Sequence, residues 1–150
     1  MDIQEAKEKA ARYCAFQERA PFEVEEKLRG YGLKPQEIKK VMEDLKKEGF
    51  VDETRFARVY ALGKFRNNKW GKIRIRQNLF LKRIGETLAQ QALDEIPLEE
   101  YEAAAIKLIK GKYAALRDED EYILQNKTAA YLIRKGFEPD LVWRLIRETE

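Results

Sequence analysis

The pattern of apolar positions repeats along the chain with a period of about fifty residues. In three segments a leucine precedes another apolar residue by five positions: Leu28 and Leu33, Leu79 and Ile84, and Leu132 and Phe137. Ile84 follows Leu33 by 51 positions, and Phe137 follows Ile84 by 53. Self-similarity at a fixed period of this length is typical of repeat architectures. The sequence therefore predicts three tandem copies of one structural unit.

The spacing inside each copy predicts helices. Further apolar residues follow Leu33, Ile84 and Phe137 at five, eight and nine positions: Ile38, Val41 and Met42; Ala89, Ala92 and Leu93; Val142, Leu145 and Ile146. Such 3–4 spacing places apolar side chains on one face of a helix. A second amphipathic stretch precedes each copy, at about residues 5–18, 53–66 and 99–116. Each unit is therefore predicted to contain one longer and two short helices.

Prolines, aspartates and glycines stand where these helices would begin and end. They are Pro21, Pro35 and Pro139 at expected first turns, Asp52 and Asp120 at expected N-caps, and Gly32 and Gly136 after middle helices. Proline is tolerated in a first helical turn, and glycine favours the left-handed residue that ends many helices. The best strand candidate, residues 72–76, alternates over five positions, but its wider apolar spacing favours a helix.

These observations predict an all-α fold of three tandem three-helix repeats. The expected repeats are residues 1–50, 51–97 and 98–150. Single units of about fifty residues bury too little surface to be stable alone, so the repeats are expected to stack. The predicted shape is an elongated, curved, solenoid-like array, and we expect it to be a monomer.

Composition narrows the function to binding. The chain has no histidine and one cysteine, Cys14, which excludes a histidine relay and an internal disulfide. No glycine loop of the phosphate-cradling kind occurs. We therefore expect no catalytic residue, no metal and no cofactor, and we expect Cys14 to be a small buried apolar residue. Without a signal peptide or a membrane-spanning apolar run, the protein is expected in the cytoplasm.

The excess of positive charge is concentrated in the middle of the chain. The net charge is only +3, yet every charged residue from Arg55 to Arg83 is a cation. These ten residues are Arg55, Arg58, Lys64, Arg66, Lys69, Lys72, Arg74, Arg76, Lys82 and Arg83. Aromatic residues are interleaved with them. Two interpretations stay open: a solvated helix face over core aromatics, or a face that binds DNA phosphates or an acidic protein surface.

Seven residues of this segment are candidate binding residues: Lys69, Trp70, Lys72, Arg74, Arg76, Lys82 and Arg83. Lys72, Arg76 and Arg83 are separated by four and seven positions, so they would share one helix face. Lys69 would extend this stripe if the helix began early. Trp70, in a predicted loop, either contacts a partner or packs between helices. A second basic set, Lys107, Lys110, Lys112, Lys127, Arg134 and Lys135, is expected to be solvated surface.

Three motifs resemble the RecX family of RecA regulators. Residues 49–57, GFVDETRFA, resemble its G-[aromatic]-x-[D/N]-[D/E]-x-x-[F/Y]-A signature, and residues 71–79, GKIRIRQNL, are similar to its G-x-x-x-I-R-Q-E-L segment. The third repeat matches its C-terminal pattern at residues 112–113, 127, 131–132 and 135–137. The resemblance covers about residues 10–148. The chain departs from the pattern at Asn78, where glutamate is usual, and at Ala20, where a serine N-cap is usual.

The resemblance implies a fold and a function. RecX-type proteins consist of three tandem three-helix repeats, bind the RecA–DNA filament along its groove, and inhibit strand exchange and ATP hydrolysis without catalysis of their own. It thereby implies a place in DNA repair, homologous recombination and the SOS response. Some members also contact DNA, so a direct DNA-binding module remains the alternative function. We expect Asn78 to strengthen the positive charge of its segment, and Ala20 to weaken the start of its helix by about 1 kcal/mol.

Overall fold

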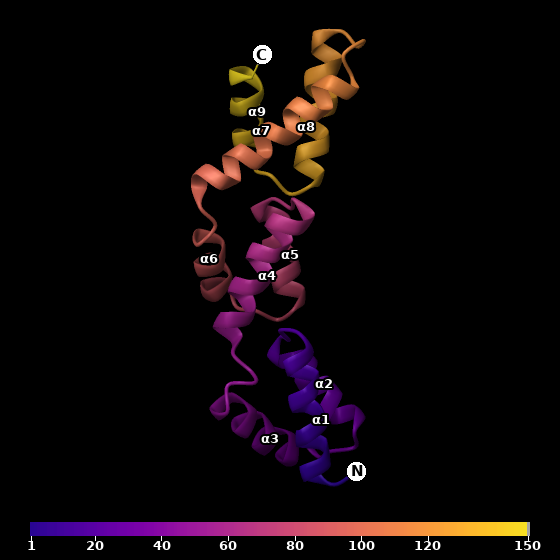
Figure 1. Ribbon diagram of the computed structural model, residues 1–150, viewed down its shortest axis with the longest axis vertical. Coiled ribbons are helices and arrows are strands. Elements are labelled where there is room, and N and C mark those ends of the chain that lie inside the picture. The colour runs from indigo at the N-terminus through magenta and orange to yellow at the C-terminus, as the bar shows by residue number, and fades with distance from the viewer. Residues whose placement is uncertain (150) are drawn as a thin grey trace.

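The computed structural model describes residues 1–149 as nine α-helices with no strand. The helices are α1 (Ile3–Phe16), α2 (Pro21–Gly30), α3 (Pro35–Lys47), α4 (Glu53–Asn68), α5 (Lys72–Leu81), α6 (Glu86–Asp94), α7 (Leu98–Ala115), α8 (Glu121–Arg134) and α9 (Pro139–Glu148). Figure 1 shows the groups α1–α3, α4–α6 and α7–α9 following one another along a long axis, with α1 and α9 at opposite ends. The predicted all-α fold of three-helix repeats is confirmed.

The middle helix of each group ends in the same hydrogen-bonded turn. The amides of Leu33, Ile84 and Phe137 donate to the carbonyls of the leucines five residues earlier, at 3.3, 3.0 and 3.1 Å. The residue before each is left-handed, with φ of 88° at Gly32, 60° at Arg83 and 103° at Gly136. This geometry is the Schellman motif, which satisfies the last carbonyls of a helix. The repeated leucine spacing in the sequence therefore marks one repeated turn.

Helices begin at the prolines and after the aspartates, where the sequence predicts them. Pro21, Pro35 and Pro139 are the first residues of α2, α3 and α9. The carboxylates of Asp52 and Asp120 accept hydrogen bonds from the backbone amides three residues later, at 2.9 and 3.0 Å. Each cap satisfies one of the amides that the first helical turn leaves without a partner.

Ala20 occupies the N-cap of α2 without a capping side chain. Its methyl group is fully buried and belongs to the core of the second and third repeats. Its backbone amide donates to Oε1 of Glu23 at 2.9 Å. A serine here would satisfy one more backbone amide but would bury a hydroxyl. The packing of Ala20 against the next repeat explains why a small apolar residue fits this position.

The molecule has two hydrophobic cores of unequal extent. The first repeat encloses its own core, which includes Leu28, Leu45 and the buried Cys14. The second and third repeats share a single core. The rings of Phe65 and Phe137 lie on either side of Tyr101, with centroid distances of 5.5 and 5.1 Å. The second and third repeats are therefore one packed body, and the first repeat has a core of its own but also packs Ala20 and Phe22 against the shared core.

Two glycines bring the second and third repeats into backbone contact. The Gly71 amide donates to the Lys135 carbonyl at 2.8 Å, and the Ile73 amide donates to the Gly136 carbonyl at 3.0 Å. A Cβ atom on Gly71 would lie 2.2 Å from the Gly136 carbonyl carbon, which no side chain could tolerate. Glycine at position 71 is therefore required by the close approach of the two loops.

Tyr101, near the start of α7, adds side-chain hydrogen bonds to this junction. Its hydroxyl accepts a hydrogen bond from the Lys72 amide at 2.9 Å and donates one to the Glu138 carboxylate. Burial, and then the hydrogen bond to Glu138, raise the pKa of Tyr101 far above its ordinary value. The phenol is therefore neutral at physiological pH and donates its proton to the hydrogen bond with Glu138.

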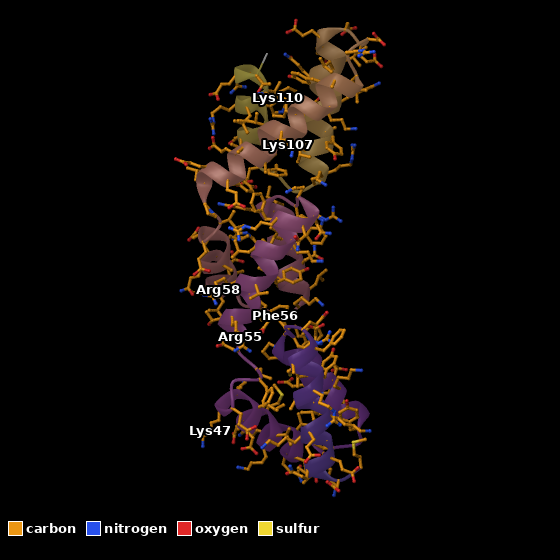
Figure 2. All side chains as sticks on the ribbon, viewed as in Figure 1. Lys47, Arg55, Phe56, Arg58, Lys107 and Lys110 are labelled. Carbon is orange, nitrogen blue, oxygen red and sulfur yellow. The ribbon has the colours of Figure 1, made fainter. Side chains whose placement is uncertain are left out.

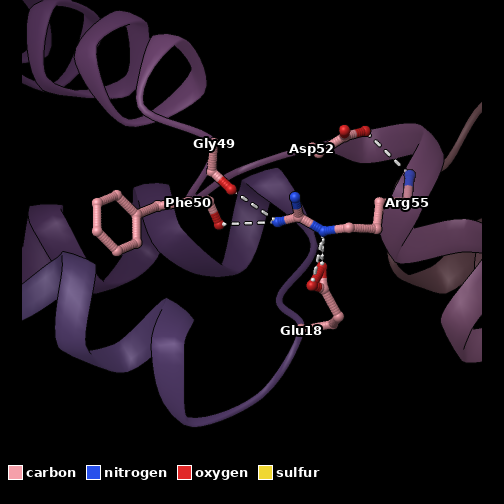
Figure 3. Close-up of polar contacts among 5 residues, drawn as sticks. All are labelled: Glu18, Gly49, Phe50, Asp52 and Arg55. Atoms are coloured by element: carbon pink, nitrogen blue, oxygen red, sulfur yellow. Dashed lines mark hydrogen bonds and ion pairs between the residues drawn. The ribbon is translucent and has the colours of Figure 1, made fainter.

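Charged side chains join the first repeat to the second (Figure 3). Nε of Arg55 lies 2.7 and 2.9 Å from the two carboxylate oxygens of Glu18, and its Nη2 donates to the Gly49 carbonyl at 2.9 Å. Lys82 pairs with Glu23 at 3.0 Å. These side chains are partly exposed, so salt screens their attraction more than it weakens a dry contact.

None of the helices within residues 1–149 is long and apolar enough to cross a bilayer. The longest, α7, has 18 residues and carries charged side chains along its length.

We predict that the two cores unfold at different denaturant concentrations. The single cysteine lies in the first core, whereas both tryptophans, Trp70 and Trp143, pack against the shared core. The first core is smaller, and it is joined to the rest by screened ion pairs and, within residues 1–149, by only two apolar side chains, Ala20 and Phe22. Thiol labelling of Cys14 should therefore begin before tryptophan emission shifts. High salt should widen the gap. Coincident transitions of the two probes would contradict the two-core description.

We also predict that Gly71→Ala destabilises the shared core. The added methyl group collides with the Gly136 backbone, so the loops must separate, at a cost of about 1–3 kcal/mol in free energy of unfolding. Gly30→Ala is the matched control, because a Cβ atom there meets nothing within 4 Å. Tryptophan-monitored urea unfolding measures both. Equal midpoints for the two variants would count against the proposed close contact.

Candidate binding surface

The ten cations of the middle segment divide into two groups by their partners. Four are ion-paired: Arg55 with Glu18, Arg66 with Glu100, Arg76 with Glu86, and Lys82 with Glu23. For the other six, no carboxylate among residues 1–149 lies within 4.0 Å: Arg58, Lys64, Lys69, Lys72, Arg74 and Arg83. Ion pairing therefore leaves the positive field of this repeat concentrated on six side chains.

Trp70 lies between two of these uncompensated cations. The Arg74 guanidinium carbon is 4.2 Å from the centre of the Trp70 ring, and Nζ of Lys64 is 5.0 Å from it. Nζ of Lys64 is also 5.5 Å from the ring of Tyr60. We call Tyr60, Lys64, Trp70 and Arg74 the tryptophan cluster. Cation–π attraction at these distances holds the two cations beside the ring.

The tryptophan cluster is built where α4 turns into α5. Lys69 is left-handed, with φ of 58°, and caps the end of α4. This turn brings the Trp70 amide to the Lys64 carbonyl at 3.2 Å. Arg74 follows in the first turn of α5 and lies against Gly136, where a Cβ atom would be 2.4 Å from the Cβ of Arg74. The glycine contact between repeats therefore positions Arg74 as well as Gly71.

Trp70 itself is half-buried and packs against the shared core. The packing interpretation of this residue is therefore confirmed, and contact of Trp70 with a partner stays a prediction. Asn78, the departure from the family pattern, donates from Nδ2 to the Arg74 carbonyl at 2.9 Å. A hydrogen bond to a neighbouring carbonyl is one that a glutamate side chain could not donate when ionised.

The predicted stripe of Lys72, Arg76 and Arg83 is wrong as a helix face. Helix α5 ends at Leu81, so the seven-residue spacing does not continue to Arg83. Arg83 adopts the left-handed conformation, and its guanidinium carbon lies 4.8 Å from the ring centre of Phe22 in the first repeat. Helix α5 begins only at Lys72, so Lys69 does not extend it.

The other candidate residues are drawn to different neighbours. Nζ of Lys72 lies 4.9 Å from the ring centre of Tyr101, at the third repeat. Arg76 pairs with Glu86 and donates to Gln90 at 2.6 Å. Lys82 faces the first repeat through Glu23, and Lys69 is exposed and donates to the Arg66 carbonyl at 2.9 Å. Of the seven candidates, the structure brings Trp70 and Arg74 together.

Sequence reasoning missed Lys64 and Tyr60 as parts of the site. Both belong to the charged and aromatic run, but they precede Trp70 on another helix. The signal was the interleaving of cations and aromatics, which indicates proximity only after the turn at Lys69 is known. Within residues 1–149, no group of three or more acidic or cysteine side chains could hold a metal. The arrangement offers cations and rings, the groups that bind anions and flat surfaces.

Three sequence models of one family match almost the whole chain. They describe the first, second and third three-helix domains of RecX and match residues 6–53, 52–93 and 99–146. Two solved structures have the same fold. The crystal structure of RecX from Lactobacillus salivarius has a TM-score of 0.91 at 24% identity, over 97% of this chain and 95% of the other. Another, titled regulatory protein RecX, has a TM-score of 0.84 at 23% identity, over 97% of this chain and 71% of the other.

Curated relatives carry the same name, regulatory protein RecX. The protein from Bacillus cytotoxicus is 28% identical over 98% of this chain and 54% of its own length. The protein from Clostridium acetobutylicum is 29% identical over 95% of this chain and 68% of its own length. This chain thus spans about half to two thirds of such relatives. With its three repeats each matched in order, the chain belongs to the RecX family.

Proposed function

We propose that this protein binds the RecA–DNA filament and restrains RecA's recombinase and ATPase activities, with no catalysis of its own. The observation that carries the proposal is the tryptophan cluster, a half-buried ring between two uncompensated cations on an extended body. Its relatives are named as regulatory proteins, which is consistent with a binding function. In this proposal the protein acts as a monomer in the cytoplasm.

The extended shape suits a polymer as partner. The nine helices of residues 1–149 follow one long axis and offer a long surface, and a nucleoprotein filament offers a long groove and many negative charges. Cations that meet phosphates release condensed counterions, which supplies affinity that falls as salt rises. Because the second and third repeats share one core, the cluster is held in place before binding, and less ordering is needed on contact.

The candidate residues differ in how much uncompensated positive charge they offer to a binding partner. Trp70 and Arg74, with Lys64, form the central contact. Lys69, Lys72 and Arg83 are uncompensated cations that would add to the field around it. Arg76 and Lys82 are already paired with carboxylates of the same chain, so they contribute less charge to a partner.

The test is inhibition of RecA's DNA-dependent ATPase by the purified protein. Near-stoichiometric protein should inhibit, and Lys64→Gln combined with Arg74→Gln should raise the concentration needed for half-inhibition. Two lost charge-assisted contacts, each worth about 1.5 kcal/mol, correspond to roughly a hundredfold. The control is Lys46→Gln with Lys47→Gln, which removes the same charge from exposed positions at the far end of α3; Lys47 is labelled in Figure 2.

Two outcomes of this assay contradict the proposal in different ways. If the unmodified protein inhibits at no ratio, regulation of RecA by this chain is excluded. If the two double variants inhibit equally, the tryptophan cluster is not the contact. The alternative, a direct DNA-binding module, is separated by binding to bare duplex at about 0.15 M salt, where non-specific complexes are weak. Equal affinity for bare DNA and for filament would favour that alternative.

The field around Trp70 predicts an asymmetric response to fluorescence quenchers. In a Trp143→Phe background Trp70 is the single tryptophan, and nearby cations concentrate iodide but repel caesium. Replacing Lys64 and Arg74 with glutamine should lower iodide quenching and raise caesium quenching. Neutral acrylamide corrects for any change in exposure of the ring. Iodide quenching that follows acrylamide in both proteins would show that no such field exists.

A further inference from the structure

A cavity of about 410 Å³ lies on the third repeat beside the end of the second. Its polar lining consists of Lys69 from the α4–α5 loop, and of Lys107 and Lys112 from α7. Its apolar lining consists of Leu108, the ring of Tyr131 on α8 and small side chains of α7. This volume falls in the range of about 300–1,000 Å³ that is usual for small-molecule sites.

The charges that line this cavity are all positive. No carboxylate belongs to its lining, and none among residues 1–149 lies within 4.0 Å of Nζ of the three lysines. A larger cavity of about 540 Å³ between α2 and α3 has acidic and basic residues together in its wall, among them Glu25, Arg29 and Lys46. The lining of this larger cavity is mixed in charge, whereas the charged residues that line the cavity on the third repeat are all lysines.

Two of the lysines contact neighbouring groups of their own repeats. Nζ of Lys112 lies 4.3 Å from the centre of the Tyr131 ring, and Lys69 donates to the Arg66 carbonyl at 2.9 Å. Lys135 also approaches the Tyr131 ring, at 5.7 Å, and donates to the Asn68 carbonyl at 3.2 Å. The Lys135 contact ties the end of α4 to the end of α8. The ammonium groups are thus partly ordered before any anion arrives.

We propose that this cavity binds a nucleoside phosphate. The phosphate oxygens would accept hydrogen bonds from Lys69, Lys107 and Lys112, and the base would lie on Leu108 and the small side chains beside Tyr131. A nucleotide matches both parts of this lining. Its phosphates carry a compact negative charge that suits the lysines, and its base is a flat ring that suits the apolar side chains. A free nucleotide and one nucleotide of a single strand share this chemistry.

The site is separate from the tryptophan cluster, and its ligand would be bound without RecA. It combines Lys107 and Lys112, which were expected to be solvated surface, with Lys69 of the second repeat and Tyr131 of α8. Lys107 and Lys112 line the cavity, whereas Lys110, between them on α7 and exposed like Lys107, lies outside its lining. Figure 2 labels Lys107 and Lys110 on this helix. The pair therefore supplies a variant and its matched control on one element.

The test is equilibrium dialysis of the full chain against radiolabelled ADP. We expect saturable binding at one site, with adenosine at least about tenfold weaker because it lacks the charged groups. Lys107→Gln and Lys112→Gln should each weaken ADP binding about tenfold, and Lys110→Gln should leave it unchanged. Thermal unfolding monitored by circular dichroism verifies that each variant is folded at the dialysis temperature.

Competition identifies the source of the nucleotide. Displacement of ADP by unlabelled ADP but not by a 5′-phosphorylated oligothymidylate supports a free nucleotide as ligand. Saturable binding of the oligothymidylate that depends on Lys107 and Lys112 supports a strand. The proposal is overturned if neither probe binds saturably, if Lys110→Gln weakens binding as much as Lys107→Gln, or if a polyglutamate peptide displaces ADP as well as ADP itself does.

Discussion

Backbone contact between Gly71 and Gly136 governs the arrangement of the second and third repeats. Two hydrogen bonds, of 2.8 and 3.0 Å, cross from one repeat to the other at this point. A side chain on Gly71 would push the loops apart, and a side chain on Gly136 would collide with Arg74. Close contact at these glycines places Tyr101 beside the start of α5. There its hydroxyl accepts a hydrogen bond from the Lys72 amide and donates one to the Glu138 carboxylate. A local absence of side chains thus joins two repeats into one body.

This junction and the one between the first two repeats differ in physical character. Aromatic packing and hydrogen bonds between the loops hold the second repeat to the third, whereas partly exposed ion pairs join the packing of Ala20 and Phe22 in linking the first. Dry contacts are little affected by salt, and exposed ion pairs are screened by it. The second and third repeats therefore hold the cations in a fixed arrangement. The ion pairs that link the first repeat to them weaken as the salt concentration rises.

Local features of the fold could be predicted from the sequence because their causes are local. The leucine five residues before an apolar residue specifies a turn, and proline or aspartate specifies a helix start within a few residues. Contacts between repeats could not be predicted in this way. Gly71 and Gly136 are 65 positions apart, and Arg55 and Glu18 are 37 apart, with no periodic pattern that would pair them. These contacts depend on how completed helices stack.

The candidate site shows the same division. The run of cations was plain in the sequence, but its division into paired and unpaired members depended on carboxylates from other helices, such as Glu18, Glu23 and Glu100. The helix-face argument failed at Arg83 because α5 ends at Leu81 and the chain turns through a left-handed residue. Lys64 joined the site only because the turn at Lys69 folds α5 back beside α4.

Amide hydrogen exchange at Gly71 and Ile73 tests the central claim most directly. Both amides lie at or near a loop, yet both donate across the junction to the third repeat. If that contact holds the body together, they should exchange only when the shared core unfolds, as slowly as amides in the middle of α4. Exchange at the rate of an open loop, while α4 remains protected, would show that the two repeats are not joined in this way.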